Sequence, residues 1–215
     1  MFRGNRVYRI TEDGKKKLVP FNYIKGLHIS FKGKNSIVEI KEPLSKFHHS
    51  KIKLGDNSIV KIGAHIDCNW KIQKLRILGF GKNQKVTIGD NFRLNGANII
   101  LGFEDNLAVN IGDDCMFSDN IKLQASDRHS VIDSTTKEVL NYGKDINIGN
   151  HVWLTGDIDI LKGVTIADNC IIGRKSVVSK SCEEANCLYA GCPAIKRKSN
   201  VNWLVNSPKR KDLDV

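Results

Sequence analysis

The sequence predicts an all-β fold, a parallel β-helix built from six-residue repeats, on three observations. Aliphatic residues recur every six positions, small or apolar residues recur four positions after each of them, and Gly, Asp and Asn gather directly after the aliphatic position. Short strands joined by turns satisfy all three observations, because each repeat then sends its aliphatic side chain inward and turns a corner. Three repeats close one triangular coil, and coils stack about 4.8 Å apart into a prism.

The six-residue period is clearest near the C-terminal end of the chain. Its aliphatic positions are Ile148, Leu154, Ile160, Ile166, Ile172 and Val178. The small or apolar positions four residues later are Val152, Ile158, Val164, Cys170, Ser176 and Cys182. An α-helix would scatter residues six apart around its surface, and a continuous strand would alternate faces every two residues. Neither fits this spacing, so we expect short inward-facing strands.

The turns repeat as well. The segments LGDN, IGDN, IGDD, IGNH and IADN begin at Leu54, Ile88, Ile111, Ile148 and Ile166. Gly, Asp and Asn tolerate the left-handed backbone that a corner needs. Shorter runs keep the period, and they are Leu54, Val60, Ile66, then Ile88, Leu94, Ile100, then Ile111, Phe117, Leu123. Because these runs are out of phase with one another, we expect irregular or bulged corners before Ile88.

The repeat divides the chain into three parts. Residues 1–21 show no repeat and are expected to form an N-terminal lead-in, and residues 22–192 are expected to form the β-helix. Residues 193–215 are expected to form a basic segment and tail, with a short helix at 200–204 and a frayed end at 207–215.

Within the β-helix, the stretch from about 124 to 147 breaks the period. Continuing the period would place His129, Thr135 and Asn141 in the apolar interior, where unpaired polar groups are costly. We therefore expect the chain to leave the prism there as a loop. Long excursions from a rigid scaffold are more often functional than accidental.

Composition limits the class of protein. The chain has 215 residues, 40% of them hydrophobic, which suits one domain with a substantial core. No apolar run is long enough for a signal segment or a membrane span, so we expect a soluble cytoplasmic protein. The net charge of +11 favours anionic partners. Without a nucleic-acid-binding motif, anionic cofactors and acidic glycans are favoured over nucleic acid, and a charged surface that only keeps the protein soluble is the alternative.

The cysteines are expected to be reduced, because no secretion signal accompanies them. Three of them have the regular spacing Cys182-x4-Cys187-x4-Cys192, which raises the question of zinc. That spacing lacks the Cys-x2-Cys pairing and companion histidines of structural zinc sites, so we expect buried packing and no metal.

Three segments near the C-terminal end carry a family signature. They are GNHVWLTG at 149–156, LKGVTIADNCIIGRKSVVSK at 161–180 and YAGCPAIKR at 189–197. Between about Ile146 and Lys198 the chain resembles the hexapeptide-repeat acyltransferases, the family of galactoside, maltose, serine and xenobiotic acetyltransferases. The resemblance implies a left-handed parallel β-helix with a protruding loop, acetyl transfer from acetyl-coenzyme A to a hydroxyl, and a homotrimer with active sites between neighbouring prisms.

Within that family, three features of the chain point to a subgroup. The uneven early coils, the long middle loop and the basic charge resemble the capsular polysaccharide O-acetyltransferases, in particular those that act on sialic-acid capsules. This narrower resemblance implies an acidic glycan as acceptor.

The resemblance assigns the general base to His129, which matches the histidine of the family's Asp-x-His segment. An alcohol is a poor nucleophile until its proton is removed, and a positioned imidazole contributes about 10²–10⁴-fold to such a step. Asp127 or Asp133 is expected to orient the ring, and the sequence does not choose between them. The alternative is a surface-loop histidine. His151 is the rival base, but it precedes the inward Val152 and is expected to point outward at a corner.

Trp153 and five cations complete the expected site. Trp153 is expected to wall the pantetheine or acceptor site or to donate its indole N–H, and packing in the core or at a trimer interface is the alternative. The coenzyme A phosphates are expected to meet a basic cluster, for which a merely soluble terminus is the alternative. The cluster consists of Arg174, Lys175, Lys196, Arg197 and Lys198.

Three rival functions remain open from the sequence. An amino-sugar N-acetyltransferase would use the same scaffold and the same base. A β-helical carbonic anhydrase would need three histidines for zinc, and only His129 and His151 are loosely placed for that role. A non-catalytic β-helical interaction protein would have no use for the His129 loop.

Overall fold

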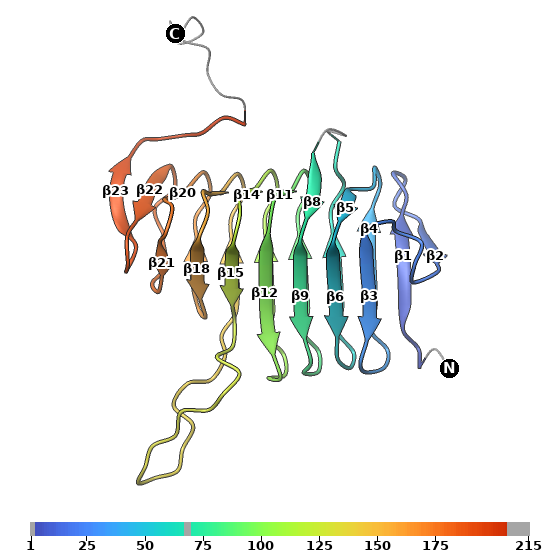
Figure 1. The fold of residues 1–215 in the computed structure, drawn as a ribbon, viewed down its shortest axis with the longest axis horizontal. Helices are drawn as coiled ribbons and strands as arrows, with labels where there is room; N and C mark the ends of the chain where they lie inside the picture. The colour runs from blue at the N-terminus through green and yellow to red at the C-terminus, as the bar shows by residue number, and fades with distance from the viewer. Residues whose placement is uncertain (1–2, 67–69, 206–215) are drawn as a thin grey trace, which may run out of the picture.

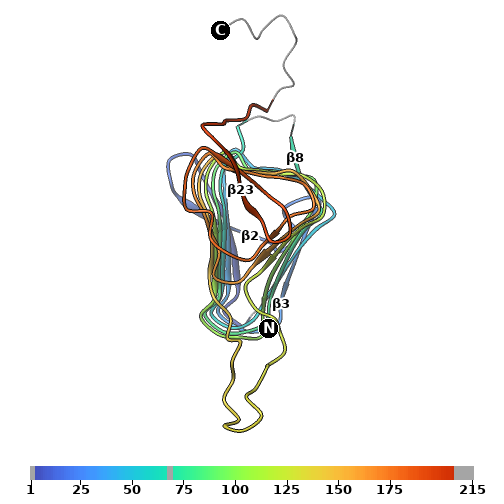
Figure 2. The same ribbon diagram turned by 90° about the vertical axis from the view of Figure 1, so that its left-hand side faces the viewer.

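The computed structural model describes residues 3–66 and 70–205, and that part of the chain contains strands and connecting segments but no helix. The strands form three sheets that run along one axis (Figure 1). Seen from the end, each coil passes through three sides of a triangle, and successive coils superimpose (Figure 2). The molecule is therefore a triangular prism whose sides are the three sheets.

The sheets are named here by their order along each coil. The first sheet contains β1 (Arg6–Ile10), β2 (Lys16–Val19), β4 (Ile37–Lys41), β7 (Ile59–Ile62), β10 (Lys85–Ile88), β13 (Ala108–Ile111), β16 (Ile146–Ile148) and β19 (Thr165–Ile166). The second sheet contains β5 (Lys46–His48), β8 (Lys71–Gln73), β11 (Arg93–Leu94), β14 (Met116–Phe117), β17 (Trp153–Leu154), β20 (Ile171–Ile172), β22 (Cys187–Ala190) and β23 (Ile195–Ser199). The third sheet contains β3 (Leu27–Phe31), β6 (Ser50–Leu54), β9 (Leu75–Gly79), β12 (Ala97–Gly102), β15 (Ile121–Gln124), β18 (Ile158–Leu161) and β21 (Val177–Val178).

The predicted six-residue period forms the core of the prism. Every aliphatic residue from Ile148 to Val178 in that series, and every residue four positions later, is at most 4% exposed. Equivalent residues stack between coils, as Leu123 does on Ile160 and Ile160 on Val178. Each fully buried Ile, Leu or Val contributes roughly 1.5–3 kcal/mol to stability. The stacked interior therefore stabilises the prism along its length.

The corners use the predicted turn residues in two ways. The last residue of each four-residue turn is left-handed, with φ of 48° at Asn57, 56° at Asn91 and 54° at Asp114. The residue before it bonds to the previous coil, as where Asp113 Oδ1 accepts the backbone N–H of Asp90 at 2.7 Å. These side chains satisfy backbone donors that strands leave unpaired where the chain turns.

Two members of the shorter runs were wrongly predicted to face inward. Ile66 is 73% exposed, because the inward positions of its coil are Val60 and Ile62 and the next second-sheet strand begins only at β8. Ile100 faces outward between buried Ile99 and Leu101. The corner that ends at Ala97 is one residue shorter than the corner of the following coil, and this shifts the period by one.

The two ends of the prism are closed by antiparallel strands. β1 pairs in parallel with β4 and so extends the first sheet, while β2 pairs antiparallel with β1. At the other end β23 pairs antiparallel with β22.

The predicted helix at 200–204 is wrong. Trp203 holds this segment against the prism instead, because its indole N–H donates to the carbonyl of His151 at 2.8 Å. The predicted frayed tail lies outside the described residues.

Four of the described cysteines are buried and free, namely Cys115, Cys170, Cys182 and Cys187. Cys192 is exposed, which corrects the expectation that it packs inside, because it lies beyond β22 where the repeat has ended. Cys68 lies outside the described residues. Within 3–66 and 70–205, no helix is long and apolar enough to cross a membrane.

Candidate active site

The long loop leaves the prism at the corner between the third and the first sheet. It connects β15 to β16 and projects far beyond the other corners (Figures 1 and 2). Its two arms are joined by the antiparallel bridge between Ile132 and Val139 and by a hydrogen bond from the N–H of Leu140 to the carbonyl oxygen of Val131 at 2.8 Å. The predicted protruding loop is confirmed.

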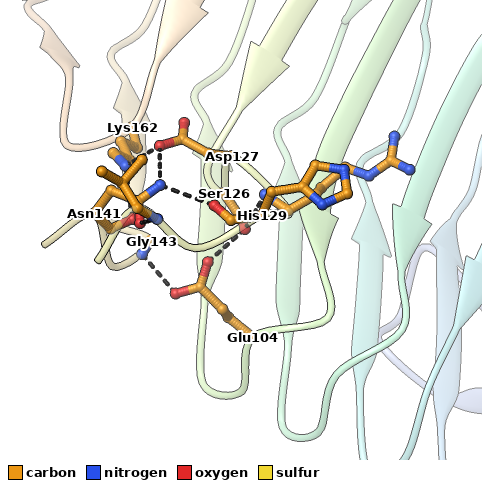
Figure 3. A network of polar contacts seen from close by, with 9 residues as sticks. Glu104, Ser126, Asp127, His129, Asn141, Gly143 and Lys162 are labelled. Atoms are coloured by element: carbon orange, nitrogen blue, oxygen red, sulfur yellow. Dashed lines mark hydrogen bonds and ion pairs between the residues drawn. The ribbon is translucent and has the colours of Figure 1, made fainter. Parts of the chain in front are cut away.

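One side of the loop's neck, defined here as residues 125–127 and 141–144, is bound by a carboxylate of the preceding coil. Glu104 accepts a hydrogen bond from the hydroxyl of Ser126 through Oε1, and one from the backbone N–H of Gly143 through Oε2 at 2.6 Å (Figure 3). Ser126 is fully buried, so its hydroxyl needs this partner. Glu104 therefore joins the two chain segments of the neck.

The other side of the neck is bound by a lysine of the following coil. Lys162 forms an ion pair with Asp127 and donates to the carbonyl oxygen of Asn141 at 2.7 Å (Figure 3). The amide of Asn141 donates to Asp127 Oδ2 at 2.8 Å. The hydrogen bond from the Lys162 ammonium has the largest influence and lowers the pKa of Asp127; burial, the next largest, raises it, and the Asn141 amide lowers it further, so the net pKa lies below the usual value.

His129 lies on the loop just beyond the neck, at a pocket of about 220 Å³. The amide of Asn141 fixes the backbone there, donating to the His129 carbonyl at 2.9 Å and accepting the N–H of Val131 at 2.6 Å. The imidazole is exposed and points away from Asp127 and Glu104 (Figure 3). The other pocket residues are Phe103, Glu104, Ser126, Arg128, Ser130, Val139, Asn141 and Tyr142.

Neither of the two predicted orienting carboxylates reaches the ring of His129. Asp127 is bonded to Lys162 and Asn141, and Asp133 accepts the backbone N–H groups of Thr135 at 2.7 Å and Thr136 at 2.8 Å. The bonds from Thr136 and Thr135 lower the pKa of Asp133. Within the described part of one chain, the imidazole of His129 has no hydrogen-bond partner. The two aspartates thus hold the loop and leave the ring free.

Trp153 and His151 form a separate aromatic cluster with Trp203. The ring of His151 stacks on Trp203 at 4.2 Å between centroids, and the ring of Trp153 lies 5.9 Å from that of Trp203. His151 sits at an outward corner as predicted, with φ of 52°, and its Nε2 lies 3.2 Å from the carbonyl oxygen of Trp203. The indole N–H of Trp153 is buried and has no partner among the described residues.

The predicted cofactor-binding cations lie near the C-terminal end of the prism, and two of them are already paired. Arg174 pairs with Asp157 at 2.5 Å, and Lys196 pairs with Glu184 at 2.5 Å. Arg197 donates through Nε to the carbonyl oxygen of Ala190 at 3.2 Å. The remaining two, Lys175 and Lys198, are exposed and form no ion pair within the described residues.

One chain does not bring these predicted site residues together. His129 lies at the corner between the third and first sheets, and Trp153 lies on the second sheet, the side opposite that corner (Figure 2). Arg174 and Lys175 lie at the corner between the second and third sheets. A site that uses all of them needs more than one prism.

The sequence analysis missed the residues that hold the loop, namely Glu104, Ser126 and Lys162. A signal for Lys162 was present in the period. Leu123 and Ile160 occupy equivalent inward positions, so two residues further on Lys162 must lie beside Ala125, where the loop begins. Glu104 gives no such signal, because the corner that carries it follows a bulge in β12.

No family model matches the chain. The chain does match a known relative, the galactoside O-acetyltransferase of Escherichia coli K12. The two are 32% identical over 146 residues, and the alignment covers 68% of each protein. This chain belongs to the hexapeptide-repeat acetyltransferases. It is also 33% identical over 133 residues to the polysialic acid O-acetyltransferase of Escherichia coli O1:K1, and that alignment spans 57% of this chain but only 43% of the relative.

Among solved structures, the hexapeptide-repeat acetyltransferase described here is similar to the polySia specific acetyltransferase NeuO. The TM-score is 0.78 at 28% identity, with 96% of this chain and 88% of that chain covered. The predicted left-handed parallel β-helix is thereby confirmed. Within the described residues, no group of three or more His, Cys, Asp or Glu side chains converges in a way that could hold a metal ion.

Proposed function

We propose that this chain transfers the acetyl group of acetyl-coenzyme A to a hydroxyl of an acidic glycan, with His129 as the general base. Family membership supports the reaction class. The observation that carries the proposal is the position of His129, whose backbone is fixed beside a pocket by a neck bonded to the coils on both sides. Half-buried charged side chains on both sides of the neck hold the loop in one arrangement, as a positioned base requires.

The exposed imidazole of His129 is suited to take a proton from an acceptor hydroxyl bound in the pocket. Acetyl-coenzyme A supplies the acetyl group as an activated thioester. As the hydroxyl oxygen bonds to the acetyl carbon, the carbon–sulfur bond breaks, and the proton held by His129 passes to the departing sulfur. The Asp127–Lys162 pair and Glu104 keep the loop in place during these proton transfers.

The basic cluster fits the phosphates of coenzyme A. Lys175 and Lys198 are exposed and free of ion pairs within the described part of the chain. Arg174 is 59% exposed and Lys196 is 44% exposed, so their carboxylate partners are weakly bound and can be exchanged for phosphate. These four cations, together with Arg197, would hold the anionic end of the co-substrate.

The site is completed by a second copy of the chain in a homotrimer. His129 and Trp153 are both expected in the site, yet they lie on opposite parts of one prism. Flat prism sides suit threefold packing, which would place Trp153 of one copy beside the loop of its neighbour. Trp153 is partly exposed on the second sheet, so its ring has surface that a neighbouring copy can contact.

The acceptor is an acidic glycan, and a sialic-acid-containing capsule polymer is the proposed case. The charge of +11 exceeds what coenzyme A alone requires, and a relative of this chain is named for polysialic acid. Attraction to a polyanion weakens as salt shortens the Debye length from about 10 Å at 0.1 M to about 3 Å at 1 M. The KM for polymer should therefore rise with salt more steeply than the KM for acetyl-coenzyme A.

The proposed function is tested by measuring release of free thiol from acetyl-coenzyme A with a panel of acidic, neutral and amino sugars. We expect release with polysialic acid that exceeds release with neutral sugars, and a product whose acetyl group is removed by mild alkali. An alkali-stable product would indicate N-acetylation. Equal rates on neutral sugars, with no salt dependence, would contradict the proposal that the acceptor is acidic. No thiol release with any acceptor would contradict the proposal that the chain is an active acetyltransferase.

A further inference from the structure

One edge of the prism carries a line of basic and aromatic residues, exposed or half-buried apart from one buried glycine, that ends at the His129 pocket. Lys32, Gly55, Phe80 and Phe103 directly follow β3, β6, β9 and β12, so they occupy equivalent positions in four successive coils at the corner between the third and first sheets. The long loop leaves the next coil at this same corner (Figure 1). At the usual inter-strand spacing this line is about 14 Å long, which exceeds one sugar ring.

The aromatic part of the line connects two hollows. Phe103 is 65% exposed and lines the His129 pocket. Its ring stacks on that of Phe80 at 5.2 Å between centroids with an angle of 26°. Phe80 lines a second, open groove of about 630 Å³. The stacked pair therefore forms a continuous aromatic surface from the groove to the pocket.

The basic part of the line lies in the second groove, with Lys32, Lys34 and Arg3 around Gly55. None of these three cations has an ion pair within the described residues, whereas Arg174 and Lys196 are paired. The one carboxylate in the groove, that of Asp56, accepts the backbone N–H of Lys34 at 2.8 Å and is thus partly used in holding the corner. Gly55 is buried, and a Cβ atom there would lie 2.1 Å from the carbonyl oxygen of Gly81, so the absence of a side chain lets the next coil approach the floor of the groove closely.

We infer that this edge groove, made of Lys32, Lys34, Gly55, Phe80 and Phe103, binds further residues of the same acidic glycan whose end or inner residue reacts at His129. A sugar ring has an apolar face of C–H groups that packs on an aromatic ring, and its carboxylate pairs with a lysine ammonium. The groove offers both chemistries two coils apart, with the lysines after β3 and the first aromatic ring after β9. This inference rests on the proposed function, because it extends the acceptor site of that reaction.

The test compares two double variants that remove the same charge. Lys32→Gln with Lys34→Gln alters the edge groove, and Lys71→Gln with Lys85→Gln removes two exposed lysines from the second and first sheets. Binding of polysialic acid is measured by calorimetry without acetyl-coenzyme A. We expect the groove variant to bind about tenfold more weakly, equivalent to about 1.4 kcal/mol, and the control to bind like the unmodified chain. Equal losses in both variants, or no loss in either, would overturn the inference.

A second pair of variants tests the aromatic surface. Phe103→Tyr keeps a ring for stacking, whereas Phe103→Leu keeps an apolar side chain without a ring face. Because Phe103 is exposed, neither change should prevent folding, and melting temperatures verify this. We expect Tyr to retain and Leu to lose affinity for the polymer. Equal affinities of the two variants would overturn the aromatic part of the inference.

The ratio of kcat/KM for polysialic acid to that for single sialic acid separates this inference from the proposed function. It should fall in the groove variant and stay constant in the Lys71, Lys85 control. If the unmodified chain acetylates the polymer and the ratio is the same in the groove variant, the inference about the groove is overturned while the proposed function stands. If the chain never releases thiol but the groove variant still binds polymer more weakly, the function is overturned while the groove is supported.

Discussion

At the scale of single residues, the corners of the prism show two different reasons for a recurring small residue. Gly112 does not have a positive φ, but a Cβ atom there would lie 2.5 Å from Asn150 Oδ1 and 2.7 Å from the backbone of Gly149. Position 112 must therefore be glycine, because any side chain there would block the close approach of the next coil. The left-handed backbone belongs instead to the Asn, Asp or His two residues later, as at Asp114. The sequence pattern locates such a corner without revealing which residue takes which role.

The cysteines differ sharply in reactivity at this scale. Burial raises the pKa of Cys115 and of Cys182 to about 12, so neither forms thiolate near neutral pH. We expect iodoacetamide at pH 8 to modify Cys192 and to leave the four buried cysteines intact, as peptide mass spectrometry would show. Modification of Cys115 in the folded protein would contradict the buried core. The same measurement supplies the thiol background for the acetyl-transfer assay.

At the scale of structural elements, the loop between β15 and β16 depends on its neck. Lys162→Met removes the ammonium that joins Asp127 to the Asn141 carbonyl. We expect kcat to fall about tenfold or more, since misplacing a reacting group by 1 Å can cost up to about 10²-fold. The melting temperature should change little, because the hexad core is untouched. Steady-state kinetics and thermal melting verify this.

Lys144→Met is the matched control for that variant, since it removes an exposed lysine from the same neck without removing an ion pair found in the described residues. It should keep most of the turnover. If both variants lose activity equally, the loss comes from the loop's charge in general, and Lys162 has no positioning role.

The neck should also respond to acid. The pKa of Asp127 is lowered in the folded chain, chiefly by Lys162, so its contribution to stability is complete above its ordinary pKa of about 3.9 and is lost as pH falls through the lowered value. Hydrogen exchange at Lys144, whose N–H donates to the carbonyl oxygen of Ala125 across the neck, should therefore accelerate below about pH 4 once it is corrected for intrinsic rates. Asp127→Asn should exchange fast already at neutral pH. Unchanged protection in acid would contradict this role for Asp127.

The sequence predicted the elements better than their contacts. The uninterrupted period from Ile148 to Val178 located the inward residues of the last coils correctly, and the broken period located the loop. It failed at Ile66 and Ile100, where a corner of different length shifts the phase. It also missed Glu104, because the corner that carries this residue follows a bulge whose position the repeat does not reveal, whereas the equivalence of Leu123 and Ile160 could have located Lys162 beside the loop.

At the scale of the whole molecule, the prism separates the predicted site residues onto different sides. We predict a homotrimer, in which the loop of one copy meets the second sheet of another, and light scattering should give three times the chain mass. Mixing His129→Ala and Trp153→Ala subunits by unfolding and refolding should restore part of the activity that each lacks alone. A fully active monomer would contradict the shared site.

The central claim is that His129 is the base for acetyl transfer, and the most direct measurement compares thiol release by His129→Ala and His151→Ala. His129 is exposed at its pocket, whereas His151 packs on Trp203. We predict that His129→Ala loses about 10²-fold or more in turnover, with unchanged melting temperature and unchanged affinity for acetyl-coenzyme A, and that His151→Ala keeps most of the turnover. Loss of turnover in His151→Ala with full activity in His129→Ala would contradict the account.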